Sequence, residues 1–205
     1  MLNATLALQR LRDGNRRFVA GEASTALVQP GRRAELATGQ TPFAIVLGCS
    51  DSRVPAELVF DQGFGELFVI RVAGNIVAPS QVGSVEFAAS RFDTRLVVVM
   101  GHSQCGAVTA TLDELLGRET TSSRNLRSIV DRIRPAVAPL VSGHAKASAW
   151  DPDTLMHEAV RANVRASVNH LRHGSEVIEG LIQSAGLEVV GAEYSLETGT
   201  VEFFE

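Results

Sequence analysis

Phe43-Ala-Ile-Val-Leu-Gly48 is a short, almost wholly apolar run that ends in glycine. A second run of this kind, Arg95-Leu-Val-Val-Val-Met-Gly101, follows about fifty residues later. Apolar runs of this length without alternation are typical of parallel strands that are buried on both faces of a sheet. The runs at 66–70 and 187–192 have the same character. Together these segments predict the strands of a buried, mostly parallel sheet.

Helical patterns lie around and between the apolar runs. We expect an amphipathic helical arm over residues 1–18 and helices over 82–92, 107–116, 126–133 and 155–171. Strands that alternate with helices are typical of an α/β fold with helices flanking a central sheet. The carboxyl end, residues 193–204, predicts a strand, a turn at Glu197-Thr-Gly199 and a last strand, which would place an antiparallel hairpin at the sheet edge.

The chain has 205 residues, of which 45% are apolar, and a formal charge of −4. This composition suits one compact unit, so we expect residues 1–205 to form a single domain. Polar or small-residue stretches at 21–30, 117–124 and 142–152 are typical of surface loops within it. No basic run with interleaved aromatic residues marks a nucleic-acid face, and we expect no nucleic-acid partner.

The first 18 residues lack the continuous apolar stretch of a signal peptide, and no apolar run approaches the roughly 20 residues that a bilayer-spanning helix needs. We therefore expect a cytoplasmic protein without a membrane partner. The chain has two cysteines, Cys49 and Cys105. In the absence of a secretory signal, they are better interpreted as thiols than as a disulfide.

Cys49 directly follows the first apolar run, and His102 directly follows the run that ends at Gly101. Ligands of open parallel sheets collect outside the carboxyl ends of the strands, where the strand order reverses. If these two strands are neighbours, Cys49, Asp51, His102 and Cys105 meet in one crevice. Thiolate, imidazole and carboxylate groups are the ligands that zinc prefers. The pattern predicts a Zn²⁺ site with two thiolates, one imidazole and Asp51 as a fourth candidate ligand.

Arg53 lies two residues beyond Asp51 and can form a bidentate pair with its carboxylate. Such a pair would draw Asp51 off the metal and leave one coordination position for water. Zinc lowers the pKa of a bound water to about 7 in favourable sites, so that this water can attack a small electrophilic carbon. We therefore assign catalytic roles to Asp51 and Arg53. A purely structural zinc site, or two buried cysteines beside an incidental histidine, are the alternatives.

An ordered set of segments carries a resemblance to a known family. The segments are Asp13-Gly-Asn-Arg-Arg-Phe18, Gly48-Cys-Ser-Asp-Ser-Arg-Val54, Gly65-Glu-Leu-Phe-Val-Ile-Arg-Val-Ala-Gly-Asn75, Gly83-Ser-Val-Glu-Phe87 and Gly101-His-Ser-Gln-Cys-Gly106. The set resembles the β-class carbonic anhydrases, whose zinc motif is Cys-x-Asp-x-Arg followed about fifty residues later by His-x-x-Cys. The resemblance implies Cys49, His102 and Cys105 as fixed zinc ligands, with Asp51 either binding zinc or pairing with Arg53.

The same resemblance implies a homodimer, or a dimer of dimers, with residues 1–40 as a helical arm and loop used in dimerisation. It implies that Gln40 hydrogen-bonds substrate and that Phe68 and Phe87 line a small apolar pocket across the dimer boundary. From the residues alone, Gln40 is equally well a polar loop residue and the two phenylalanines are ordinary core. Phe87 stands where many members of the family have tyrosine.

The activity that the resemblance implies is the zinc-dependent, reversible hydration of carbon dioxide to bicarbonate and a proton. Hydrolysis of carbon disulfide or carbonyl sulfide on the same scaffold is an alternative. A non-catalytic, zinc-stabilised interaction protein is another alternative, although such a protein has no need of both Asp51 and Arg53.

Overall fold

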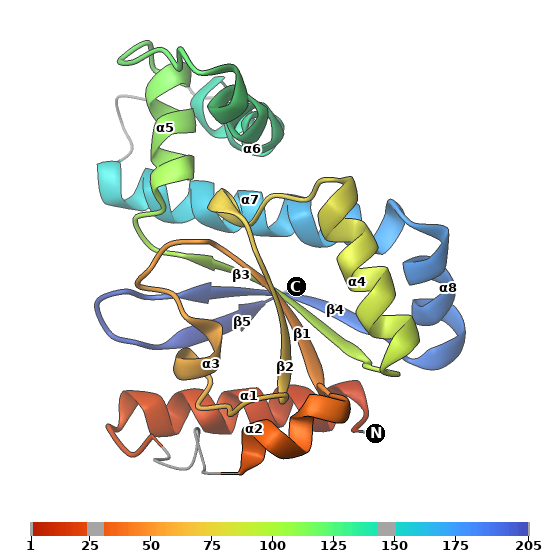
Figure 1. Cartoon of the computed structure of the whole chain (residues 1–205). Coiled ribbons are helices and arrows are strands. Elements are labelled where there is room, and N and C mark those ends of the chain that lie inside the picture. Colours follow the sequence, from red (N-terminus) through yellow and green to blue (C-terminus); the bar gives the residue numbers. More distant parts are fainter. Residues whose placement is uncertain (1, 24–30, 143–150, 205) are drawn as a thin grey trace.

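The computed structural model describes residues 2–23, 31–142 and 151–204. Within them a single sheet has the strand order β2-β1-β3-β4-β5 (Figure 1). The strands are β1 (Ala44–Gly48), β2 (Leu67–Arg71), β3 (Leu96–His102), β4 (Glu188–Tyr194) and β5 (Val201–Phe204). β1 to β4 are mutually parallel and β5 runs antiparallel to β4. The predicted α/β fold, with its antiparallel strand at one edge, is confirmed.

The two central strands, β1 and β3, are buried along their whole length. Successive residues point to opposite faces, so that Ala44 and Val46 join one apolar cluster and Ile45 and Leu47 join the other. Helices cover both faces, which explains why these strands read as continuous apolar runs rather than as an alternating pattern.

One face of the sheet is covered by α1 (Ala4–Val19), which buries Ala4, Ala7 and Leu11. The side chain of Asn15 fixes this helix to its own chain, because it donates to the carbonyls of Val59 and Gly199 and accepts from the amide of Val201. The predicted amphipathic helix is therefore present and packs on its own sheet. Its use in dimerisation stays a prediction.

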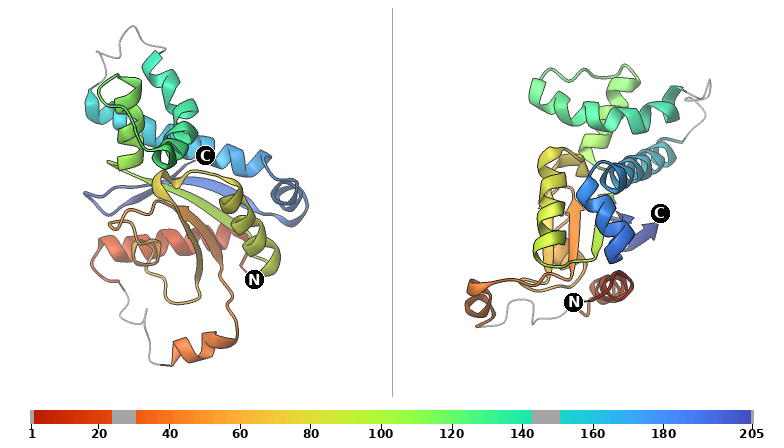
Figure 2. Two further views of the ribbon diagram at one scale, coloured as in Figure 1. Left: turned by 45° about the horizontal axis from the view of Figure 1, so that its top comes forward. Right: turned by 90° about the vertical axis from the view of Figure 1, so that its right-hand side faces the viewer.

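The opposite face is covered by α4 (Pro79–Arg91), α7 (Pro152–His173) and α8 (Glu176–Ala185). Two helices, α5 (Gly106–Leu115) and α6 (Arg124–Ser142), lie beyond the carboxyl ends of the strands and pack against the first part of α7, as Figures 1 and 2 show. Shorter helices are α2 (Arg32–Glu35) and α3 (Ala56–Val59), with 3-10 turns at Leu36–Thr38 and Ala73–Asn75. Within the described residues, no helix is long and apolar enough to cross a membrane.

One helix prediction needs correction, and one helix was missed. We expected the helix that starts near 126 to end at 133, but α6 continues to Ser142 through Pro135 and Pro139. The prolines are four residues apart and both exposed, so the carbonyls that lose their amide partners lie on the solvent side. α8 was not predicted, although Ser175 caps its first turn and Gly186 ends it in the left-handed conformation. The predicted loops at 21–30 and 142–152 lie largely outside the described residues.

Candidate metal centre

The strand order places a switch point between β1 and β3. The chain leaves β1 toward β2 on one side, while β3 and β4 lie on the other side. The two strands are in register, with Gly48 beside Met100, so that Cys49 and His102 emerge next to each other. The adjacency of these two strands, which the metal-site prediction required, is present.

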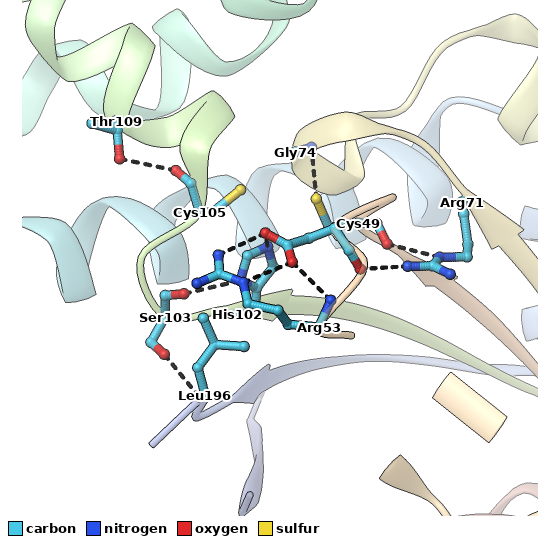
Figure 3. Close-up of polar contacts among 10 residues, drawn as sticks. Cys49, Arg53, Arg71, Gly74, His102, Ser103, Cys105, Thr109 and Leu196 are labelled. Carbon is cyan, nitrogen blue, oxygen red and sulfur yellow. Dashed lines mark hydrogen bonds and ion pairs between the residues drawn. The ribbon is translucent and has the colours of Figure 1, made fainter. Parts of the chain in front are cut away.

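Three metal-ligating side chains converge at this point (Figure 3). The Cys49, His102 and Cys105 side chains each offer one donor atom, and these atoms all lie within 4.8 Å of one another. All three residues are buried, with exposed fractions of 5%, 0% and 1%. In a tetrahedral zinc site, bond lengths of about 2.0 to 2.3 Å set donor–donor separations of about 3.5 to 3.8 Å. The donors therefore need to move by about 1 Å or less to hold the ion.

The orientation of His102 suits a metal ligand. Its Nδ1 lies 2.9 Å from the carbonyl oxygen of Ser103, which fixes Nδ1 as the protonated nitrogen. Its Nε2 is buried and has no hydrogen-bond partner among the described residues. A buried imidazole nitrogen with a free lone pair is expensive unless it binds something, and metal-ligating histidines use this arrangement.

The Asp51 carboxylate borders the three donors but is held by Arg53. Arg53 donates from Nε to Oδ1 at 2.9 Å, from Nη2 to Oδ2 at 2.7 Å and from its backbone N–H to Oδ1 at 2.9 Å. Asp51 Oδ2 lies 4.0 Å from His102 Nε2. Asp51 and Arg53 therefore form the predicted bidentate pair in this structure, and whether Asp51 binds a metal stays a prediction. The hydrogen bonds from Arg53 hold the pKa of the Asp51 carboxyl well below its ordinary value.

The pKa values of the two neighbouring thiols are shifted in opposite directions. The hydrogen of the neighbouring Cys105 thiol lowers the pKa of Cys49 to about 4, and the nearby His102 imidazole and backbone amides act in the same direction against burial. The neighbouring Cys49 thiolate and burial together raise the pKa of Cys105 far above its ordinary value. These shifts favour a thiolate at Cys49, and a divalent cation would replace the remaining thiol proton of Cys105.

Two groups that our sequence analysis did not assign support the loop that follows β1. Arg71 donates from Nε to the carbonyl of Cys49 at 3.0 Å and from Nη2 to the carbonyl of Asp51 at 2.6 Å. The Gly74 backbone N–H donates to Cys49 Sγ at 3.4 Å (Figure 3). The only sequence signal was their position in the segment Gly65–Asn75, which the resemblance singled out as a whole.

The predicted substrate-binding residues lie elsewhere in this chain. Gln40 precedes β1, so the length of that strand, about 16 Å for five residues, separates it from Cys49. Phe68 pairs with Ile45, four residues before Cys49. Phe87 lies on α4, is 54% exposed, and forms an aromatic cluster with Phe68 and Phe92. Within one chain, none of the three meets the metal ligands.

Comparison with known proteins assigns the family. The family model for carbonic anhydrase matches residues 44–201. The carbonic anhydrase of Mycolicibacterium smegmatis is 39% identical over 200 residues, which cover 98% of this chain and 93% of that protein. Carbonic anhydrase 2 of Mycobacterium tuberculosis is 37% identical over 197 residues, covering 96% and 91%. The chain belongs to the β-class carbonic anhydrases. It is thus an enzyme of a lyase family.

Solved structures agree with this assignment. The β-carbonic anhydrase CcaA superposes with a TM-score of 0.73 at 28% identity, covering 97% of this chain and 87% of that one. A tetrameric β-carbonic anhydrase from Sordaria macrospora gives a TM-score of 0.76 over 97% of both chains, and at 23% identity it supports the fold alone. The range matched by the family model contains the three convergent donors, Asp51 and Arg53. In this carbonic anhydrase the family likeness and the donor geometry therefore point to the same end of the sheet.

Proposed function

We propose that this protein catalyses the zinc-dependent, reversible hydration of carbon dioxide to bicarbonate and a proton. The observation that carries the proposal is the convergence of Cys49, His102 and Cys105 beside a carboxylate that Arg53 holds away from the three donors. Two thiolates and one imidazole are a donor set that zinc prefers, and three protein ligands leave a fourth position for water. A zinc ion held by them would acidify that water.

The chain's own residues then supply orientation. The Asp51 carboxylate stays ionised because Arg53 lowers its pKa, so at neutral pH it acts only as a hydrogen-bond acceptor. It lies next to the place where the donors converge, since its Oδ2 is 4.0 Å from His102 Nε2. A water at that place can donate a hydrogen bond to Asp51. This bond would direct a lone pair of the water oxygen toward substrate. Burial of the three donors limits competing water.

A second copy of the chain would complete the substrate pocket. Gln40, Phe68 and Phe87 lie away from their own metal ligands, and the edge strand β2 has no neighbour on its outer side within the described residues. Exposed apolar side chains flank this strand, namely Leu58, Phe64 and Phe87. Next to Gln40 is an open hollow of ≈ 570 Å³, lined by Arg33, Leu36 and Phe64 among others. We propose a homodimer, or a dimer of dimers, in which this region faces the partner's metal centre.

We keep two further predictions with this function. Two buried, closely spaced thiols that serve as metal ligands suit a reducing compartment, so a cytoplasmic location remains our expectation. The relatives named above are carbonic anhydrases and support neither carbon disulfide or carbonyl sulfide hydrolysis nor a non-catalytic role.

The test combines stopped-flow carbon dioxide hydration with zinc analysis of the same preparation. We expect one zinc per chain and hydration well above the uncatalysed rate, with slower turnover of carbonyl sulfide. A preparation that holds one zinc per chain and hydrates nothing would disprove the proposed activity. A preparation without zinc, even after incubation with the metal, would disprove the site.

A further inference from the structure

The buried face of α7 contains two polar residues in an otherwise apolar stripe. Asn163 is 2% exposed and Ser167 is 5% exposed, and both lie among buried alanine, valine and leucine side chains. A buried polar side chain costs stability unless it is hydrogen-bonded. Both side chains bond to the same short turn, Ala73–Asn75, which lies far from α7 in the sequence.

Asn163 bonds directly to the Gly74 carbonyl. Its Nδ2 donates to the Gly74 carbonyl at 2.8 Å, and this bond is buried. Ser167, one turn further along α7, donates from Oγ to the Asn75 carbonyl at 3.2 Å. The Gly74–Asn75 segment is therefore fixed by two hydrogen bonds from one helix.

Side chains of α5 and α6 also pack against this turn. Gly74 has φ +68, and a Cβ at this position would lie 2.8 Å from Ile133 Cδ1 on α6 and 2.9 Å from Ala107 Cβ on α5. Asn75 also has a positive φ, 44°. A residue other than glycine would clash at position 74, and the backbone conformation of both residues depends on its surroundings. Asn163 is thus one of the groups that decide where the Gly74 N–H points.

That N–H points at a metal ligand. Gly74 N lies 3.4 Å from Cys49 Sγ, in a buried contact. A hydrogen bond to a thiolate withdraws charge from the sulfur and weakens its donation to a bound metal, and such outer contacts tune metal affinity and the acidity of a bound water.

We propose that Asn163 is a positioning residue for the metal centre, which holds the Gly74 carbonyl so that the Gly74 N–H stays directed at Cys49 Sγ. The proposal rests on the proposed function in one respect, since it requires that Cys49 binds a metal ion. Among the described residues, Asn163 forms no hydrogen bond with the side chains of Cys49, His102 or Cys105, and it acts through the intervening turn. Ser167 supports the same turn without touching Gly74.

The experiment uses the full chain loaded with Co²⁺ in place of zinc, because thiolate-to-cobalt charge-transfer absorption reports the charge on the sulfur directly. Asn163→Ala removes the amide N–H that donates to the Gly74 carbonyl, and Asn163→Asp removes this N–H while keeping the shape of the side chain. Ser167→Ala is the matched control, because it removes a buried hydrogen bond from the same helix to the same turn. The zinc-loaded forms of all variants are also challenged with a chelator.

We expect both Asn163 variants to absorb at longer wavelength than wild type, because the sulfur keeps more charge. They should also release zinc about tenfold faster, because losing the fixed orientation of a ligand costs more affinity than the extra charge on its sulfur adds. Ser167→Ala should keep the wild-type absorption even where its melting temperature falls. Unshifted absorption in whichever Asn163 variant folds, or an equal shift in Ser167→Ala, would overturn the assignment. Absorption without any thiolate band in the wild type would reject the metal site itself, a result that separates failure of the proposed function from failure of this inference.

Discussion

The two ends of β1 differ in how much of a site one chain can build. At the carboxyl end, Cys49, His102 and Cys105 converge without any help from outside the chain. The other end and the β2 edge carry Gln40, Phe68 and Phe87, none of which reaches the metal ligands of its own chain. We therefore infer that one chain can bind a metal by itself, whereas substrate binding is a property of an assembly.

This difference has a physical cause. Metal ligands must be fixed to a few tenths of an ångström, which adjacent parallel strands within a rigid sheet achieve. A pocket for a small apolar molecule mainly needs apolar surfaces that exclude water. Two copies of a surface can form such a pocket when they meet.

Removing a ligand at the self-contained end should have the largest effect. We expect Cys49→Ala and His102→Ala each to lose zinc and to lower hydration at least about a thousandfold, because the metal supplies several kcal/mol of charge stabilisation. Zinc analysis and stopped-flow assays on one preparation measure both. Thr109→Val is the control, since Thr109 only donates to the Cys105 carbonyl. Full zinc occupancy in either ligand variant would contradict the assignment.

A mixing experiment addresses the incomplete end. Gln40→Ala should lower hydration about a hundredfold while keeping zinc, if it removes one substrate-orienting donor. Dimers re-formed from equal amounts of Gln40→Ala and Cys49→Ala chains should regain about one quarter of wild-type activity, because half of them are mixed and each mixed dimer has one intact site.

The control for mixing pairs Cys49→Ala with His102→Ala, which leaves no intact ligand set in any dimer and should restore nothing. If Gln40 served the ligands of its own chain, the first mixture would restore nothing either, and the proposed dimer-spanning pocket would be wrong.

The contrast also explains what could be predicted from sequence. β1 ends at Gly48 and β3 ends at His102, and both strands are buried on both faces. Their apolar runs, and the ligand residues Cys49 and His102 next to them, could therefore be predicted from the sequence. The order of β1 and β3 in the sheet then follows from ordinary α/β topology. The fold and the convergence of the three donors come from such short-range signals.

Other features depend on contacts that no local pattern encodes. Asn163 meets Gly74 across 89 residues, and a lone asparagine on a helix says nothing of its partner. Residues 135 and 139 of α6 are prolines that usually end helices, and only their common exposed side explains why this helix continues. His157 is exposed on α7, yet its Nε2 lies 3.2 Å from the buried Glu193 carboxylate, a contact that its position in the sequence does not reveal.

Arg53 should have a smaller effect than the ligands because it acts on Asp51. We expect Arg53→Ala to keep zinc, to release Asp51 toward the metal, and to lower activity about ten- to a hundredfold. X-ray absorption at the zinc edge should then show one additional light ligand. Arg53→Lys is the matched variant, since it keeps the charge without the fork that binds both carboxylate oxygens. An unchanged zinc spectrum in Arg53→Ala would refute this role.

Arg71 offers a still smaller effect, on stability. Arg71→Met removes two hydrogen bonds to the carbonyls of Cys49 and Asp51 and should lower the free energy of unfolding by about 1 to 2 kcal/mol. Arg71→Lys should lose about half as much. Urea unfolding of the metal-free proteins measures this without a contribution from zinc binding. Equal stability of Arg71→Met and wild type would show that the loop holds its shape unaided.

The smallest expected effect concerns Glu193, on the β4 side of the ligand end and away from β2. Burial raises the pKa of this carboxyl above its ordinary 4.5, against the attraction of His157 and Arg161 and together with repulsion by Glu202 and Glu158. The folded state therefore favours protonated Glu193, so its contribution to stability is present at low pH and lost as pH rises through the folded pKa. Relative to wild type, the stability of Glu193→Gln should increase as pH rises from the ordinary carboxyl value of 4.5 toward neutral. Urea unfolding across this range measures the gain, which should be independent of protein concentration because the residue lies away from the proposed dimer edge. If the gain in stability instead increased on dilution, Glu193 would affect subunit association. The proposed separation between the metal end and the dimer edge would then be wrong.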